Sequence, residues 1–261
     1  MSKYSRLLFI IAASLLFLNS CKKSDKYVAK RLPVANNAYL RIVHVAPNFR
    51  ATLSQPDSFH VCINDTKINA TLITYNTFFP TSTANTDTYA AVAAGNDKVR
   101  FSIIGKNLVD SQTILTLPIV LGTGSYYTLF ITDNIRDGQT TPQILSQDLV
   151  VRPDTGKYSI RFAHMILSDT AGKTVDVYSF RQATNIFSAV TPGTVTGFVT
   201  LPCLVPATDT LSIRRTGTGQ ELVRLNGVAI TNNQRVYTIV YRGTSGTTGT
   251  KPRGAVVINN R

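Results

Sequence analysis

The chain repeats itself, and this repeat limits its fold more than any other feature. The matching blocks, in the same order in both copies, are residues 39–45 and 159–165, 59–61 and 175–177, 99–103 and 209–213, 127–131 and 237–241, and 141–143 and 251–253. The insertions and deletions fall between the blocks, so the blocks themselves are units of structure. We therefore predict two copies of one domain, residues 38–151 and 157–261, joined near residues 152–156.

Each copy has the composition of a β-protein. Short runs rich in Thr, Val, Ile, Tyr and Phe alternate with Gly, Asn and Asp, and after residue 37 no apolar stripe of helical period exceeds two turns. The prediction is an all-β chain with two tandem antiparallel Ig-like β-sandwich domains; a barrel is the alternative. The strands expected in the first copy are residues 38–46, 57–64, 67–74, 86–94, 97–104, 112–120, 125–133 and 144–151.

Two local patterns add detail to this prediction. Alternation around Val61 places His60 and Cys62 on the outward face of a strand. Gly122 precedes Tyr127 by a few residues, and this pattern is similar to the tyrosine corner of Ig-like sandwiches.

A targeting segment precedes the repeat. Lys3 and Arg6 form a positive start, residues 7–18 are apolar, and Ser20 is a small residue directly before Cys21. This run is too short to span a bilayer and fits a signal peptide.

The sequence Leu-Asn-Ser-Cys at residues 18–21 resembles the lipobox of bacterial lipoproteins. The resemblance implies that residues 1–20 are a signal peptide and that Cys21 is lipidated, which would hold the protein on a membrane. The alternative is an ordinary secretory signal beside a cysteine. Residues 21–37 are polar and basic, and we predict that they form a flexible tether.

Positive charge is concentrated in the second copy. Residues 152–261 carry 13 Lys and Arg against 5 Asp and Glu, whereas residues 38–151 carry 7 against 8. This excess predicts either a polyanion-binding face or a dispersed solvated surface. The candidate residues are Arg214, Arg215, Arg224, Arg235, Arg242, Lys251 and Arg253. An acidic glycan or another envelope protein is the expected partner, and nucleic acid is not expected outside the cytoplasm.

Sequence patterns for catalysis or metal binding are missing. The chain has no H-x-H, H-E-x-x-H, C-x-x-C or G-x-S-x-G pattern, and Glu221 is its only glutamate. His44 and His164 occupy equivalent positions, which favours a structural role such as a ring nitrogen bonded to a loop carbonyl. We predict no enzyme activity, metal or cofactor. A glycan-active enzyme with a site built from loops is the alternative.

Two cysteines remain once Cys21 is assigned to the anchor. Cys62 and Cys203 fall at non-equivalent positions in the two copies. An oxidising envelope permits a bridge between them, but separate buried thiols are the expected state.

Residues 40–47, Leu-Arg-Ile-Val-His-Val-Ala-Pro, and residues 175–178, Val-Asp-Val-Tyr, resemble domain of unknown function 4397. That domain often occurs in tandem in lipoproteins of Bacteroidota, and the second copy departs from its pattern after His164. The resemblance implies an outer-membrane lipoprotein facing the periplasm or the exterior, and it brings no activity with it. Asp-Thr-Ala at residues 169–171 resembles a Bacteroidota O-glycosylation signal, which implies modification of Thr170. The combined expectation is a lipid-anchored, non-catalytic binding or structural module.

Overall fold

The computed structural model describes residues 36–47, 49, 57–81, 89–104, 111–132, 143–167, 173–245 and 251–260. Residues 36–261 form one compact unit, separate from residues 1–35. Every regular element in the described ranges is a β-strand, which confirms the predicted all-β class. None of the described residues belongs to a helix long and apolar enough to cross a membrane.

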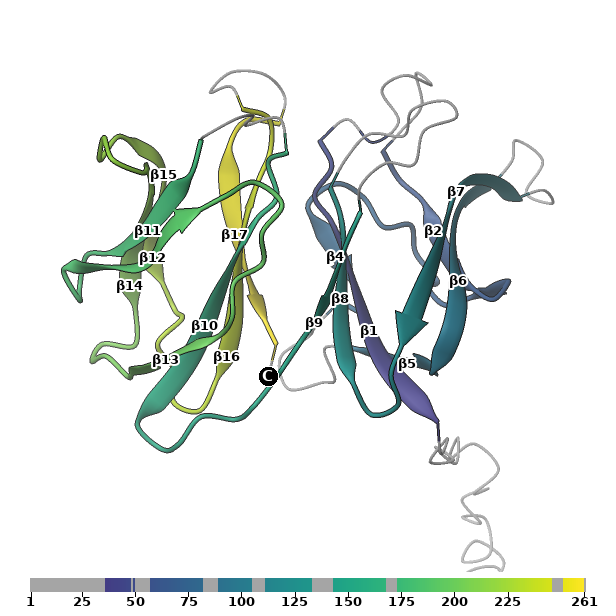
Figure 1. Ribbon diagram of the computed structural model, residues 1–261, viewed down its shortest axis with the longest axis horizontal. Helices are drawn as coiled ribbons and strands as arrows, with labels where there is room; N and C mark the ends of the chain where they lie inside the picture. Colours follow the sequence, from purple (N-terminus) through teal and green to yellow (C-terminus); the bar gives the residue numbers. More distant parts are fainter. Residues whose placement is uncertain are drawn as a thin grey trace, which may run out of the picture. The chain divides into compact units, whose positions relative to one another are not determined.

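The strands of the first copy form two sheets (Figure 1). The strands are β1 (Asn37–His44), β2 (His60–Ile63), β3 (Thr66–Lys67), β4 (Thr77–Phe79), β5 (Ala90–Ala93), β6 (Gly95–Ile104), β7 (Ser111–Leu121), β8 (Tyr126–Ile131) and β9 (Ile144–Gln147). The order β4-β1-β8-β9, with β5 also beside β1, defines the β1 sheet, and β3-β2-β6-β7 defines the β2 sheet.

The strands of the second copy repeat this arrangement. They are β10 (Lys157–His164), β11 (Val175–Ser179), β12 (Thr184–Val190), β13 (Val199–Pro202), β14 (Asp209–Arg215), β15 (Glu221–Val228), β16 (Val236–Arg242) and β17 (Gly254–Asn259). The β10 sheet has the order β13-β10-β16-β17, and the β11 sheet has the order β12-β11-β14-β15. The strand orders of the two copies correspond, except that two strands, β4 and β5, pair with β1 whereas one strand, β13, pairs with β10.

One strand pair in each sandwich is parallel, which the prediction of antiparallel sheets did not include. β1 runs parallel to β8 with Leu40 opposite Tyr127, and β10 runs parallel to β16 with Ile160 opposite Tyr237. A parallel pair needs a long connection between its strands. Most of each copy lies between these two strands, so the chain supplies that connection.

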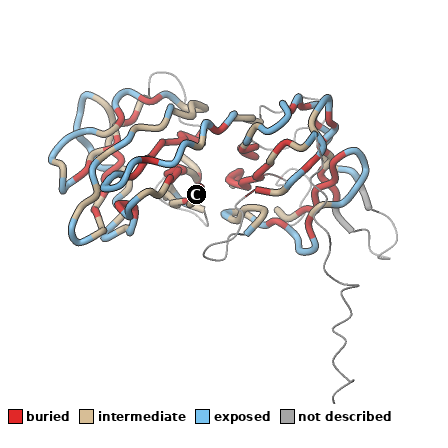
Figure 2. Tube along the Cα trace, turned by 90° about the horizontal axis from the view of Figure 1, so that it is seen from below, coloured by how far each residue is buried: buried red, intermediate tan, exposed pale blue. Residues whose placement is uncertain are grey.

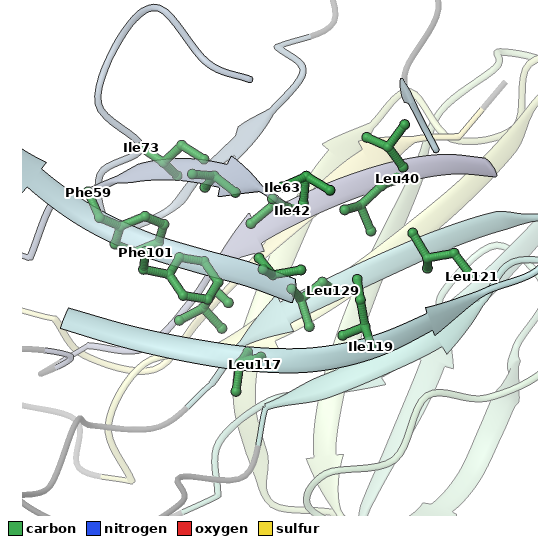
Figure 3. Packing of buried hydrophobic residues seen from close by; sticks show 14 of the residues in the cluster. Leu40, Ile42, Phe59, Ile63, Ile73, Phe101, Leu117, Ile119, Leu121 and Leu129 are labelled. Atoms are coloured by element: carbon green, nitrogen blue, oxygen red, sulfur yellow. The ribbon is translucent and has the colours of Figure 1, made fainter. Parts of the chain in front are cut away.

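Each sandwich has its own apolar core. In the first, Leu40 and Ile42 of β1 face Phe59 and Phe101 of the opposite sheet (Figure 3). The Phe59 and Phe101 rings meet edge to face with centroids 4.9 Å apart. Each large apolar side chain buried in this way stabilises the fold by roughly 1.5–3 kcal/mol.

The β1 and β10 sheets are buried on both faces. Val43 and Phe130 on the outer face of the β1 sheet belong to one apolar cluster with Ala163, Met165 and Val240 of the β10 sheet. The buried stretches follow these strands almost without interruption (Figure 2). The two sandwiches therefore share a third core, which we call the junction core.

A buried polar network lies beside the junction core. Arg161 pairs with Asp148 at 2.7 Å, and both side chains are at most 2% exposed. Tyr89 and Thr128 donate to the same carboxylate at 2.7 and 2.5 Å, and Asn260 donates to Tyr89 Oη at 2.8 Å. This buried network links residues of both copies at one place.

Two side-chain expectations have different outcomes. Tyr127 Oη accepts a hydrogen bond from the Gly122 N–H at 2.9 Å, which is the contact of a tyrosine corner. His60 and Cys62, expected on an outward face, are each only 4% exposed. The expectation of exposure is wrong because period-two alternation identifies the face of a strand but does not show whether that face is covered.

Candidate ligand-binding surface

Two of the predicted basic residues contact the first sandwich. Arg242 donates a hydrogen bond to Tyr75 Oη at 3.0 Å. The Lys251 ammonium lies 4.9 Å from the centroid of the same ring and forms an ion pair with Asp57. Both cations are thus occupied by groups of the first copy.

Three other predicted residues lie apart from one another. Arg215 is next to Arg214 on β14, so its side chain points to the opposite face of the sheet. Arg235 directly precedes β16, and Arg253 directly precedes β17, where both are half-buried. The seven candidates therefore do not form one face.

The two remaining candidates, Arg214 and Arg224, lie together on the outer face of the β11 sheet. Its cross-strand rows are Tyr178–Ser212–Arg224 and Asp176–Arg214–Glu221. Residues directly opposite one another in paired strands share a face. We call Tyr178, Phe180, Arg214, Glu221 and Arg224 the β11 platform.

Arginines and aromatic rings are stacked in this platform. The Arg214 guanidinium carbon lies 3.8 Å from the centroid of the Tyr178 ring, and that of Arg224 lies 4.7 Å from the centroid of the Phe180 ring. The two rings meet edge to face at 5.4 Å. Such stacking fixes the plane of each guanidinium. Arg224 Nη2 lies 2.9 Å from Glu221 Oε2, so this guanidinium is already paired within the platform.

The platform also holds a fixed carboxylate. Arg224 Nε donates to Glu221 at 3.0 Å and Ser212 Oγ donates to it at 2.7 Å, and these bonds lower the pKa of Glu221. Arg214 Nε donates to Ser212 Oγ at 3.2 Å, while its two terminal nitrogens bond to no described residue. The surface thus offers donors for an anion, an acceptor for a hydroxyl group, and Phe180, which is 40% exposed, for an apolar face.

Sequence reasoning missed the two aromatic members of the platform. Tyr178 follows Val175 and Val177 in a strand with period-two alternation, so an outward position was readable from the sequence. Its pairing with Arg214 depends on the β11–β14 register, which the sequence does not show.

The equivalent histidines have structural environments. His44 Nε2 donates to the Asp57 carbonyl at 2.9 Å, so the predicted bond to a loop carbonyl is confirmed at this position. In the second copy, His164 Nδ1 instead accepts from the Ile166 N–H at 3.4 Å. Both rings are fully buried.

Burial of His44 predicts a pH-dependent stability. Burial lowers its pKa from 6.5 to about 4, with Asp57 opposing and Lys251 reinforcing the shift. The fold favours the neutral ring, so this stability is complete above pH 6.5 and is lost as the pH falls towards 4, by about 3 kcal/mol in all. Urea unfolding between pH 4.5 and 7.5 should show that His44→Gln costs less stability at the acid end. An equal cost at both pH values would contradict this assignment.

The remaining sequence predictions concern the three cysteines, glycosylation and metal binding. Cys21 and Thr170 lie outside the described residues. Cys62 is buried, Cys203 is half-buried, and both are free thiols. Within the described ranges, no group of three His, Cys, Asp or Glu side chains is arranged to hold a metal ion.

The fold and this surface define a tandem β-sandwich protein with an exposed face of stacked arginine and aromatic side chains. No family profile matches the chain, and no curated protein matches it by sequence. Among solved structures, it is similar to the fimbrial anchor protein Mfa2 from Porphyromonas gingivalis, with 11% identity, 85% of this chain and 97% of that chain covered, and a TM-score of 0.22. It is also similar to a candidate polysaccharide binding protein (DUF1812) from Bacteroides thetaiotaomicron, with 9% identity, 80% and 92% coverage, and a TM-score of 0.22. At this level of likeness, neither structure indicates what this chain binds.

Proposed function

We propose that this chain is a lipid-anchored, non-catalytic module of the bacterial cell envelope and that the β11 platform binds an acidic glycan. The lipobox-like residues 18–21 support the anchor, and the resemblance of residues 40–47 to a domain found in envelope lipoproteins supports the location. The platform supports the ligand.

The observation that carries the proposal is the stacking of Arg214 on Tyr178 at 3.8 Å beside Arg224 on Phe180. The Arg214 guanidinium, held in place by a ring, can donate to a carboxylate or sulfate through its terminal nitrogens without first losing much side-chain freedom. The carboxylate of Glu221 can accept a sugar hydroxyl, and an exposed ring can pack against the C–H face of a sugar. An acidic glycan presents all three of these groups.

The test is binding of the full mature chain to polygalacturonate oligomers, measured by titration calorimetry. Arg214→Ala should weaken binding about tenfold or more, because a hydrogen bond to a charged group contributes about 1.5–3 kcal/mol. Binding should also fall steeply with added salt, since exposed charges are screened over about 8 Å at physiological ionic strength.

Arg235→Ala is the matched control, because it removes the same charge from the same sandwich outside the platform. Its affinity should stay within twofold of the wild type. If Arg235→Ala weakened binding as much as Arg214→Ala, the platform would not be the binding surface.

A further inference from the structure

A groove runs between the two sheets of the first sandwich, along their edge strands β7 and β9. It has a volume of about 890 Å³ and follows residues 116–120 of β7. Leu129 of β8 and Leu145 of β9 form the opposite wall. Leu117, Ile119 and Leu129 belong to the buried apolar cluster of this sandwich (Figure 3).

In the second sandwich, the corresponding edge strands β15 and β17 contact each other.

One carboxylate in the groove has a hydrogen-bond partner, among the described residues, for only one of its two oxygens. Asp97 lines it and is 5% exposed. Its Oδ1 accepts a hydrogen bond from Asn64 Nδ2 at 2.7 Å, while its buried Oδ2 has no partner among the described residues. Burying an unpaired carboxylate oxygen is costly, so a donor from a ligand would relieve that cost.

The strand edges favour an extended ligand. β9 is the last strand of the β1 sheet, so one edge of its backbone is unpaired within the described structure. On the other side, Pro118 removes a backbone donor from β7, which disfavours strand addition there. Backbone pairing is thus available along β9, beside the apolar walls.

We infer that this groove binds an extended segment of a partner protein, which adds as a strand beside β9. Alternate apolar side chains of the segment pack against Leu117, Ile119 and Leu145, and a Lys or Arg side chain donates to Asp97 Oδ2. Strand addition of this kind takes affinity from backbone hydrogen bonds and specificity from side-chain pockets. Lys98 also lines the groove but is exposed to solvent, whereas Asp97 is buried, so the charge of Asp97 selects a basic side chain over a neutral one. This inference is independent of glycan binding on the β11 platform.

The test uses blocked nine-residue peptides of alternating Val and Ser with Lys, Gln or Glu at the centre. With the full mature chain, the Lys peptide should bind about tenfold more tightly than the Gln peptide, and the Glu peptide more weakly still, as a bond between charged groups predicts. Backbone NMR shifts on adding the Lys peptide should map to β9. These comparisons use the wild-type protein, so they do not depend on the folding of a variant.

Asp97→Asn keeps an acceptor for Asn64 and should abolish the preference for Lys over Gln. Asp65→Asn is the matched control, because its side chain lies nearby but is 78% exposed and paired with Arg100; it should keep the preference. Equal affinity for all three peptides, no binding, or NMR shifts confined to the β11 platform would overturn the inference.

Discussion

Asp148→Ala is expected to destabilise the protein by about 3–5 kcal/mol, because it leaves a buried arginine without its partner. Arg161 lies 2.7 Å from Asp148 and is only 2% exposed, so water cannot replace the lost carboxylate. The substitution also removes the acceptor of Tyr89 and Thr128. Urea unfolding followed by circular dichroism measures the change.

Asp154→Ala provides the control for this measurement. Asp154 also pairs with a cation, Lys157, at 3.1 Å, but its side chain is 82% exposed. An exposed pair of this kind contributes about 0–1 kcal/mol. If both substitutions had the same small effect, the junction network would not stabilise the fold.

Cys21→Ser is expected to move the protein from the membrane fraction to the soluble fraction. A thioether-linked diacylglycerol cannot form on serine, and without buried acyl chains the membrane affinity supplied by about 0.8 kcal/mol per CH₂ is lost. Cell fractionation followed by detergent extraction measures the distribution of the protein.

Cys203→Ser is the matched control, since it removes a half-buried thiol outside the lipobox-like residues. It should remain entirely with the membrane. A Cys21→Ser protein that was fully processed and still extracted from membranes by detergent would contradict the lipoprotein assignment.

Much of the fold was predictable because it depends on local patterns. The matching blocks of the repeat correspond to strands in equivalent places, such as β1 with β10 and β8 with β16. Other strands were misplaced: an expected strand at residues 67–74 is reduced to Thr66–Lys67, and Thr77–Phe79 was not expected. Short edge strands of this kind depend on pairing with a neighbour more than on composition.

The junction core was not predicted because it depends on contact between the copies. The mainly apolar residues 40–46 were a sign of it, since a strand buried on both faces loses its alternation. Arg41 and Arg161 concealed this apolar pattern. A charged residue in a strand indicates a face exposed to solvent, unless the sequence also shows a partner that would pair with it in the interior. Asp148, the partner of Arg161, lies in no aligned block.

The candidate site was predicted only in part. Charge counting identified the second copy, but charge carries no information on which face of a sheet a side chain occupies. Arg214 and Arg215 are adjacent in sequence and point to opposite faces, whereas Arg214 and Arg224 are ten positions apart and both contact Phe180. The Asp97 carboxylate had no sequence signal beyond its place at the start of an expected strand.

The junction core holds the two sandwiches together as an interface holds the protomers of a dimer, but here a short covalent linker also joins them. Residues 152–156 turn a bimolecular association into an intramolecular one, and a short linker corresponds to an effective concentration in the millimolar range. The docking of the sandwiches is consequently independent of how much protein a cell makes. Because Thr128 bonds to Asp148 in one copy and Thr238 bonds to Asn260 in the other, the two sandwiches are not interchangeable at the junction core.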